Sequence, residues 1–116
     1  MNLRELTERV GAVNLIPEVG LTEATIERGY ASDLLSDVLA SAPSGGVLVT
    51  IQVHMNVIAV AVHAGLAAVI FASDRRPDED VRQRAVEEGI ALFASSDSAF
   101  DIVGKLYALG VRGPLA

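Results

Sequence analysis

Polar side chains alternate along one short stretch of this chain, at Thr50, Gln52, His54 and Asn56. They stand where an apolar, strand-forming run (47–51) meets a second apolar run (57–62). Polar residues gathered at the end of a buried strand are typical of the ligand-facing edge of an α/β domain. An imidazole in that position can act as a general base or hydrogen-bond a ligand. We therefore expect Gln52, His54 and Asn56 to face one shallow pocket.

Three other segments carry polar residues just before an expected helix: 30–33, 73–76 and 95–97. The free N–H groups of a helix N-terminus attract anions, and Arg75 and Arg76 add positive charge. The alternative is that the short polar residues only cap their helices and that the arginine pair is a solvated loop. The site predicted for a phosphate or carboxylate consists of Ser32, Asp33, Gln52, His54, Asn56, Ser73, Arg75, Arg76 and Ser95.

His54 lacks the partners that define a catalytic or metal-binding histidine. The spacing of Asp33, Asp74 and Asp97 is not that of a metal site. The pair Gly45-Gly46 precedes a strand, which is the wrong side for a phosphate-binding loop. The sequence shows neither a nucleophile elbow nor a fixed carboxylate pair. We assign no catalytic residue and no metal ligand, and a structural hydrogen bond remains the alternative role of His54.

The composition narrows the classes of partner and cofactor. The chain has 116 residues, which suits one domain with its own core. It has no cysteine, which excludes disulfides and cysteine-ligated zinc or iron–sulfur centres within the chain. A net charge of −6 argues against nucleic acid and an anionic membrane surface as partners. Residues 1–5 lack the start of a signal peptide and no apolar run approaches the roughly 18 residues of a membrane span, so we expect a cytoplasmic protein.

Strands and helices alternate along the chain. The expected elements are a helix (3–10), strands (12–16 and 25–30), a helix (34–42), strands (47–51, 66–72 and 90–94), and helices from Asp78 to Gly89 and from Asp97 to Gly110. Ser32 or Asp33 would cap the helix 34–42, and residues 95–97 would cap the last helix. Asp78 and the two residues after it would lie in a first helical turn, where carboxylates offset the helix dipole. This order indicates βαβ units and a largely parallel sheet.

The run 57–62 could be a strand followed by a hairpin turn at 63–65. As a helix it would have Asn56 as N-cap and Gly65 just beyond its C-terminus, and it would be buried on more than one side because it lacks a charged stripe. The local pattern does not decide between them. The last helix carries Phe100, Val103 and Tyr107 along one side.

Two motifs resemble a known family. Residues 29–40 (GYASDLLSDVLA) and 50–61 (TIQVHMNVIAVA) closely resemble short, stand-alone proteins of the DRTGG-domain family, and residues 98–101 and 106–110 fit as well. The resemblance covers nearly the whole chain, so it implies one DRTGG-like domain over 1–116. The family is similar to the N-terminal domain of HPr kinase/phosphorylase. The resemblance thus implies a three-layer α/β sandwich with a helix after Asn56.

The resemblance implies a regulatory or ligand-sensing role without established catalysis. DRTGG domains also stand between other domains in some phosphotransacetylases and CBS-domain proteins. Stand-alone members resemble proteins found beside iron-hydrogenase genes, and some carry iron–sulfur labels, for which this cysteine-free chain has no ligands. The chain also departs from the Asp-Arg-Thr-Gly-Gly signature that gives the family its name, because Asp74-Arg75 is followed by Arg76-Pro77 instead of Thr-Gly-Gly.

Three functions stay open at this point. The first is a regulatory module that binds a small anionic metabolite or nucleotide at the carboxyl edge of the sheet. The second is a homodimeric interaction protein or accessory module of a metabolic enzyme such as a hydrogenase. The dimer would bury part of the helix 56–64, because exposed Val and Ile are unusual on a monomer. The third is a small enzyme that depends on His54.

Overall fold

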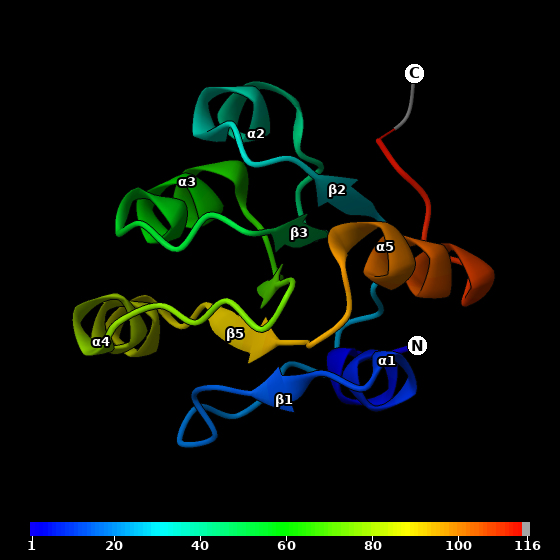
Figure 1. Ribbon diagram of the computed structural model, residues 1–116, viewed down its shortest axis with the longest axis horizontal. Helices are drawn as coiled ribbons and strands as arrows, with labels where there is room; N and C mark the ends of the chain where they lie inside the picture. Colours follow the sequence, from blue (N-terminus) through cyan, green and yellow to red (C-terminus); the bar gives the residue numbers. More distant parts are fainter. Residues whose placement is uncertain (115–116) are drawn as a thin grey trace.

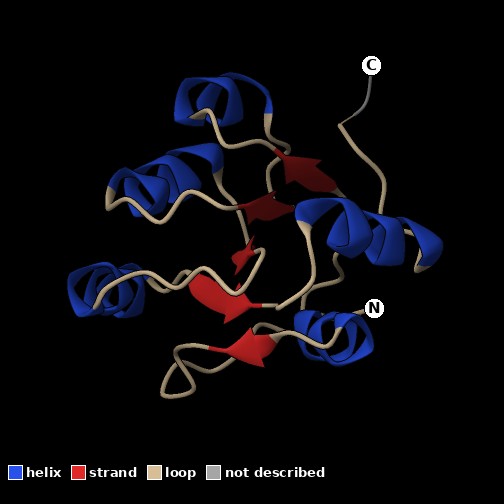
Figure 2. Ribbon diagram, viewed as in Figure 1, coloured by secondary structure: helices blue, strands red, loops and turns tan. Residues whose placement is uncertain are grey.

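A single sheet lies between two layers of helices (Figure 1). The computed structural model describes residues 1–114. In chain order its elements are α1 (Leu3–Val10), β1 (Val13–Asn14), β2 (Gly29–Ala31), α2 (Leu35–Ser41), β3 (Val47–Thr50), α3 (Asn56–Ala64), β4 (Ala68–Phe71), α4 (Glu79–Glu88), β5 (Ala91–Ala94) and α5 (Ala99–Ala108). Helices α2, α3 and α4 cover one face of the sheet, and α1 and α5 cover the other (Figures 1 and 2). The predicted three-layer α/β sandwich is confirmed.

The sheet is mainly parallel, as predicted. Its strand order is β1-β5-β4-β3-β2, and only β1 is antiparallel, pairing with β5. From β2 to β5 each strand lies beside the next one in the sequence. The connecting helices α2, α3 and α4 all lie on the same face (Figure 1). The carboxyl ends of these four strands therefore form a row along one edge, and each is followed by a segment that the sequence predicted to bind a ligand.

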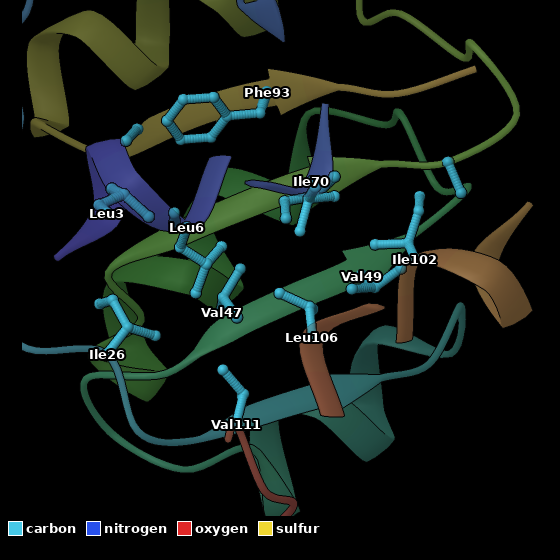
Figure 3. Close-up of a cluster of buried hydrophobic side chains, with 14 residues drawn as sticks. Leu3, Leu6, Ile26, Val47, Val49, Ile70, Phe93, Ile102, Leu106 and Val111 are labelled. Carbon is cyan, nitrogen blue, oxygen red and sulfur yellow. The ribbon is translucent and has the colours of Figure 1, made fainter. Parts of the chain in front are cut away.

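The strands are buried on both faces because helices cover both sides of the sheet. Alternate residues of β3 illustrate this: Val47 and Val49 belong to the cluster under α1 and α5, and Leu48 belongs to the cluster under α2, α3 and α4. Figure 3 shows the first cluster, where side chains of α1 and α5 surround those of the central strands. The core thus fixes the strand ends from which the candidate site extends.

The ambiguous run 57–62 is helical. It lies in α3, which ends at Gly65 in the left-handed conformation (φ 70°), as the helical alternative predicted. Val57, Ile58 and Ala61 are buried against the sheet, and α2 and α4 flank the helix. The missing charged stripe therefore reflects the central place of α3 in its layer.

Several predicted helix caps are wrong by one to three residues. The N-cap of α3 is Met55, not Asn56, and that of α2 is Leu34, not Ser32 or Asp33; neither Met55 nor Leu34 makes a side-chain cap bond. The last helix begins after Ser98, whose hydroxyl accepts the N–H of Asp101 (3.3 Å), so residues 95–97 are not its caps. Asp78 is itself an N-cap and accepts the N–H of Val81. Ser32, Asp33 and Ser95, which were expected as caps, accept hydrogen bonds within the loops instead.

The two outer strands are short. The main chain of Arg112 pairs alongside the start of β2: Gly29 N–H donates to Arg112 O (2.8 Å), and Arg112 N–H donates to Glu27 O (3.0 Å). On the opposite edge, β1 ends where Asn14 Oδ1 accepts the N–H of Ile16 (2.9 Å). The predicted strands 25–30 and 12–16 thus exist as Gly29–Ala31 and Val13–Asn14.

The apolar side of α5 noted in the sequence does not pack on the sheet. Phe100 is 86% exposed, Tyr107 57% and Val103 37%. The residues of α5 that enter the core are Ile102 and Leu106. Helix α5 is therefore apolar on both its inner side and part of its outer side.

Candidate functional site

Thr50 and Asp33 join two neighbouring loops at the carboxyl edge of the sheet. Thr50 ends β3 and is fully buried, and its hydroxyl donates to Asp33 Oδ1 (2.8 Å). The same carboxylate oxygen accepts the N–H of Ile51 (2.9 Å). Thr50 Oγ1 in turn accepts the N–H of Gln52 (3.1 Å). Asp33, which follows β2, therefore holds the start of the β3–α3 loop in place.

Three of the four alternating polar residues, Thr50, Gln52 and His54, each accept a hydrogen bond from the backbone N–H two positions later. The bond from Gln52 N–H to Thr50 is the first of them. Gln52 Oε1 then accepts the N–H of His54 (3.2 Å), and His54 Nδ1 accepts the N–H of Asn56 (3.1 Å). An accepting Nδ1 corresponds to the neutral imidazole with its proton on Nε2. His54 thus takes the capping role at the start of α3 that the sequence assigned to Asn56.

These bonds leave mainly hydrogen-bond donors facing outward. The acceptors Gln52 Oε1 and His54 Nδ1 are occupied by the backbone. Within residues 1–114, Gln52 Nε2, His54 Nε2 and the Asn56 side chain have no protein partner. His54 and Asn56 are exposed, and Gln52 is half-buried. Donor groups in one loop suit a ligand that carries acceptor oxygens.

Tyr30 links β2 to α2. Its hydroxyl lies 2.9 Å from both carboxylate oxygens of Asp37. The hydrogen bond to this carboxylate raises the pKa of Tyr30, because loss of the phenolic proton would break the bond and place two negative charges together. Ser32 lies in the loop between β2 and α2, and its hydroxyl accepts the N–H of Leu34 (3.2 Å).

The loops after β4 and β5 are joined by main-chain bonds. Ser73 N–H donates to Asp97 O (2.8 Å), and Asp74 N–H donates to Ser95 O (2.8 Å). Both donors have left-handed backbones, with φ 56° at Ser73 and 54° at Asp74. Ser95 is buried, and its hydroxyl accepts the N–H of Asp97 (3.1 Å). This half of the edge is therefore closed by its own backbone.

The two arginines of this half differ in their partners. Arg76 pairs with Asp74 at 3.2 Å, and both side chains are largely exposed. Arg75 has no carboxylate within 4.0 Å among residues 1–114. Since β4 lies beside β3, the Arg75 loop is next to the loop that carries Gln52 and His54. Arg75 is the arginine of the pair whose charge is open to an anion.

The structure has three cavities worth comparing with this site. The first, of about 430 Å³, lies between α3 and α4 and is lined by Asn56, Asp80, Arg84 and Glu87 among others. The second, of about 180 Å³, is mostly apolar and lies between β2 and α5. The third, of about 410 Å³, lies along α5. Neither Gln52 nor His54 lines any of these three cavities, and His54 is exposed whereas Gln52 is half-buried.

Sequence reasoning did not include Thr50 in the site, although Thr50 is the residue that joins its two loops. The signal was present, because the alternation of polar residues begins at Thr50. Among residues 1–114, no group of three or more His, Asp or Glu residues could hold a metal ion. Likewise, no helix in this part of the chain has the length and apolar character to cross a bilayer.

Comparison with known proteins gives a precedent for the fold. No family model matches the chain, and no curated protein does. A solved structure does match: the CBS and DRTGG domains of the regulatory region of Clostridium perfringens pyrophosphatase, complexed with its activator diadenosine tetraphosphate. The TM-score is 0.68 at 10% sequence identity, over 90% of this chain and 45% of the other. The chain therefore shares the fold of part of this CBS and DRTGG region and spans less than half of its length, and the resemblance of its motifs to DRTGG domains agrees with that fold.

Proposed function

We propose that this chain is a regulatory module that binds a small phosphorylated metabolite or nucleotide at the carboxyl edge of its sheet. The observation that carries the proposal is the set of free donors on the β3–α3 loop, Gln52 Nε2 and His54 Nε2, together with the unpaired Arg75 on the loop that follows the neighbouring strand β4. Phosphate oxygens accept hydrogen bonds from such groups and are attracted to a guanidinium. The pyrophosphatase region that shares the fold was crystallised with a nucleotide activator, which supports the same class of ligand.

The ligand would be held mainly by local contacts. The chain carries a net charge of −6, so its overall field repels anions. Two carboxylates of this edge are already engaged, because Asp33 accepts two hydrogen bonds and Asp74 pairs with Arg76. Arg75 then supplies the attraction, and the neutral amide and imidazole donors supply direction. Binding of this kind should weaken as salt is added.

A thermal-shift series tests the proposal. Inorganic phosphate, AMP, ATP and diadenosine tetraphosphate are the probes, each raised to millimolar concentration. A ligand present at 100 times its Kd stabilises the folded state by about 2.7 kcal/mol, so a binder should raise the Tm clearly. Arg75→Gln should reduce that rise without changing the Tm of the free protein, because Arg75 makes no side-chain bond within residues 1–114.

Two substitutions at His54 separate binding from structure. His54→Ala removes both the Nδ1 acceptor and the Nε2 donor, whereas His54→Asn retains an acceptor that can still bond the N–H of Asn56. Both should lose the response to ligand, but His54→Asn should keep the stability of the free protein. No Tm rise with any probe, or an unchanged rise in all three variants, would exclude this site.

A further inference from the structure

The outer side of α5 is apolar where a surface helix is normally polar. Phe100, Val103 and Tyr107 follow one another at helical spacing and are 86%, 37% and 57% exposed. They are distinct from Ile102 and Leu106, which α5 buries against the sheet. An exposed apolar stripe of this kind marks an interaction surface.

Next to Phe100 the same helix has a shallow hollow that is open to solvent. The cavity of about 410 Å³ is lined by Phe100, Gly104 and Ala108, which are one turn apart, together with Asp101 and Lys105. A Cβ placed on Gly104 would meet nothing within 4 Å, so packing within this chain does not require glycine there. Glycine is also a poor helix former. The protruding ring and the hollow thus lie on one face, with no use inside the described chain.

We propose that α5 is the contact between two copies of this chain, packed antiparallel about a two-fold axis. In this arrangement Phe100 of each copy enters the hollow over Gly104 and Ala108 of the other. A two-fold axis brings the same patch together on both subunits, so a ring and a hollow one turn apart are matched twice by one contact. The absence of a side chain at Gly104 lets the two helices approach closely.

The charges on α5 fit a second copy. Asp101 and Lys105 stand four residues apart on one flank of the stripe, and both line the hollow. Because an antiparallel pair reverses their order, Asp101 of one copy comes toward Lys105 of the other. Lys105 lies 2.5 Å from Asp97 of its own chain, and Asp101 has no ion pair among residues 1–114. A chain with net charge −6 needs such local complementarity to associate with itself.

This surface differs from the one predicted from the sequence. The homodimer was expected to bury part of α3, where Val62 is 43% exposed and most other large apolar residues face the sheet. The α5 surface exposes Phe100, Val103 and Tyr107 in one stripe; the Arg112 guanidinium lies 3.8 Å from the centre of the Tyr107 ring, and Phe100 is the most exposed of the three. The inference is also independent of ligand binding, because α5 lies on the opposite face of the sheet from α3 (Figure 1).

The test is the mass of the full chain in solution, measured by light scattering and sedimentation from low to tens of micromolar. We expect the wild type to be a dimer at tens of micromolar. Phe100→Ser and Gly104→Gln should each raise the dimer Kd at least tenfold. Gly104→Gln should also raise the Tm at dilutions where the wild type is monomeric, since glutamine is a better helix former than glycine. Loss of the dimer in that variant cannot then be ascribed to unfolding.

Control variants on α3 and α5 test which helix forms the dimer contact. Val62→Ser on α3 should leave the dimer intact. Asp101→Lys should weaken the dimer, because it places two like charges opposite each other across the axis. A wild type that is monomeric at tens of micromolar overturns the proposal. So does a dimer that survives Phe100→Ser, or one that only Val62→Ser disrupts.

Discussion

The two halves of the carboxyl edge are held together by different groups. Between β2 and β3, side-chain oxygens of Asp33 and Thr50 join the loops. Between β4 and β5, main-chain N–H groups of Ser73 and Asp74 donate to carbonyls of the facing loop. Main-chain bonds survive most substitutions, whereas side-chain bonds do not. Function that depends on adjustable groups is therefore expected in the β2–β3 half, where the free donors of Gln52 and His54 lie.

The largest effect should come from removing the hydroxyl of Thr50. Thr50→Val keeps the buried shape but leaves the N–H of Gln52 without its acceptor and Asp33 with the N–H of Ile51 as its remaining partner. The loss of unfolding free energy should be about 2 kcal/mol. Ser95→Ala in the other half should lose less, about 0.5–1 kcal/mol, because the main-chain bonds across that half remain. Urea denaturation of both variants measures the difference, and equal losses would contradict the division into two halves.

A smaller loss is expected at the start of α3. His54→Ala removes the acceptor of the Asn56 N–H and should cost about 1 kcal/mol, the usual value of an N-terminal cap. His54→Asn should recover most of it. The comparison uses the same urea titrations in the absence of ligand. If His54→Asn is as unstable as His54→Ala, the imidazole contributes by packing and not by capping.

In the β4–β5 half, one substitution should raise the free energy of unfolding instead of lowering it. Ser73 has φ 56°, a conformation that costs an L-residue about 1–2 kcal/mol. Ser73→Gly should relieve that cost, less the roughly 0.5–1 kcal/mol that glycine loses through its greater freedom in the unfolded chain. A net gain of about 0.5 kcal/mol is expected. Ser32→Gly, whose hydroxyl bonds the N–H of Leu34, should give no gain.

The smallest effect concerns alkaline pH. The hydrogen bond to Asp37 raises the pKa of Tyr30 in the folded state. The stabilisation is therefore fully present below the ordinary tyrosine value near 10 and is lost as pH rises through the folded value. The Tm of the wild type should fall more steeply above pH 10 than that of Tyr30→Phe. Parallel curves would show that the bond to Asp37 does not persist in solution.

Much of the fold could be predicted because its signals are local. The apolar runs that became β3, β4 and β5 are bounded by loop residues, and their alternation with helices indicates a parallel sheet. Helix α3 was ambiguous because a helix in the middle of a layer has little polar face to reveal its period. The caps were misplaced because the side chain that reaches a helix N–H depends on loop geometry one or two residues away.

The site was harder to predict than the fold. Positions 52–56 were predicted to form part of a site because polar residues interrupt apolar runs, and that role stays a prediction. Gln52 and His54 accept hydrogen bonds from the backbone two residues later, which is the structural role that the sequence offered as the alternative for His54. These bonds occupy the acceptor atoms and leave Gln52 Nε2 and His54 Nε2 free. The link between Asp33 and Thr50 joins residues 17 apart, and no local pattern reveals it. The outer stripe of α5 could not be told from its buried side, because both sides are apolar.

The pairing of Arg112 beside β2 has a consequence for the order of folding. Strands β2 to β5 pair with neighbours that follow them along the chain, so these pairs close short loops at low entropic cost. The pairing of Arg112 with the start of β2 joins segments that are distant in the sequence: Arg28 and Gly113, which also contact each other, are 85 residues apart. We expect the central strands to form the nucleus and this outer seam to close last. The amide protons of Gly29 and Arg112 should then exchange with solvent well before those of Leu48 and Val69.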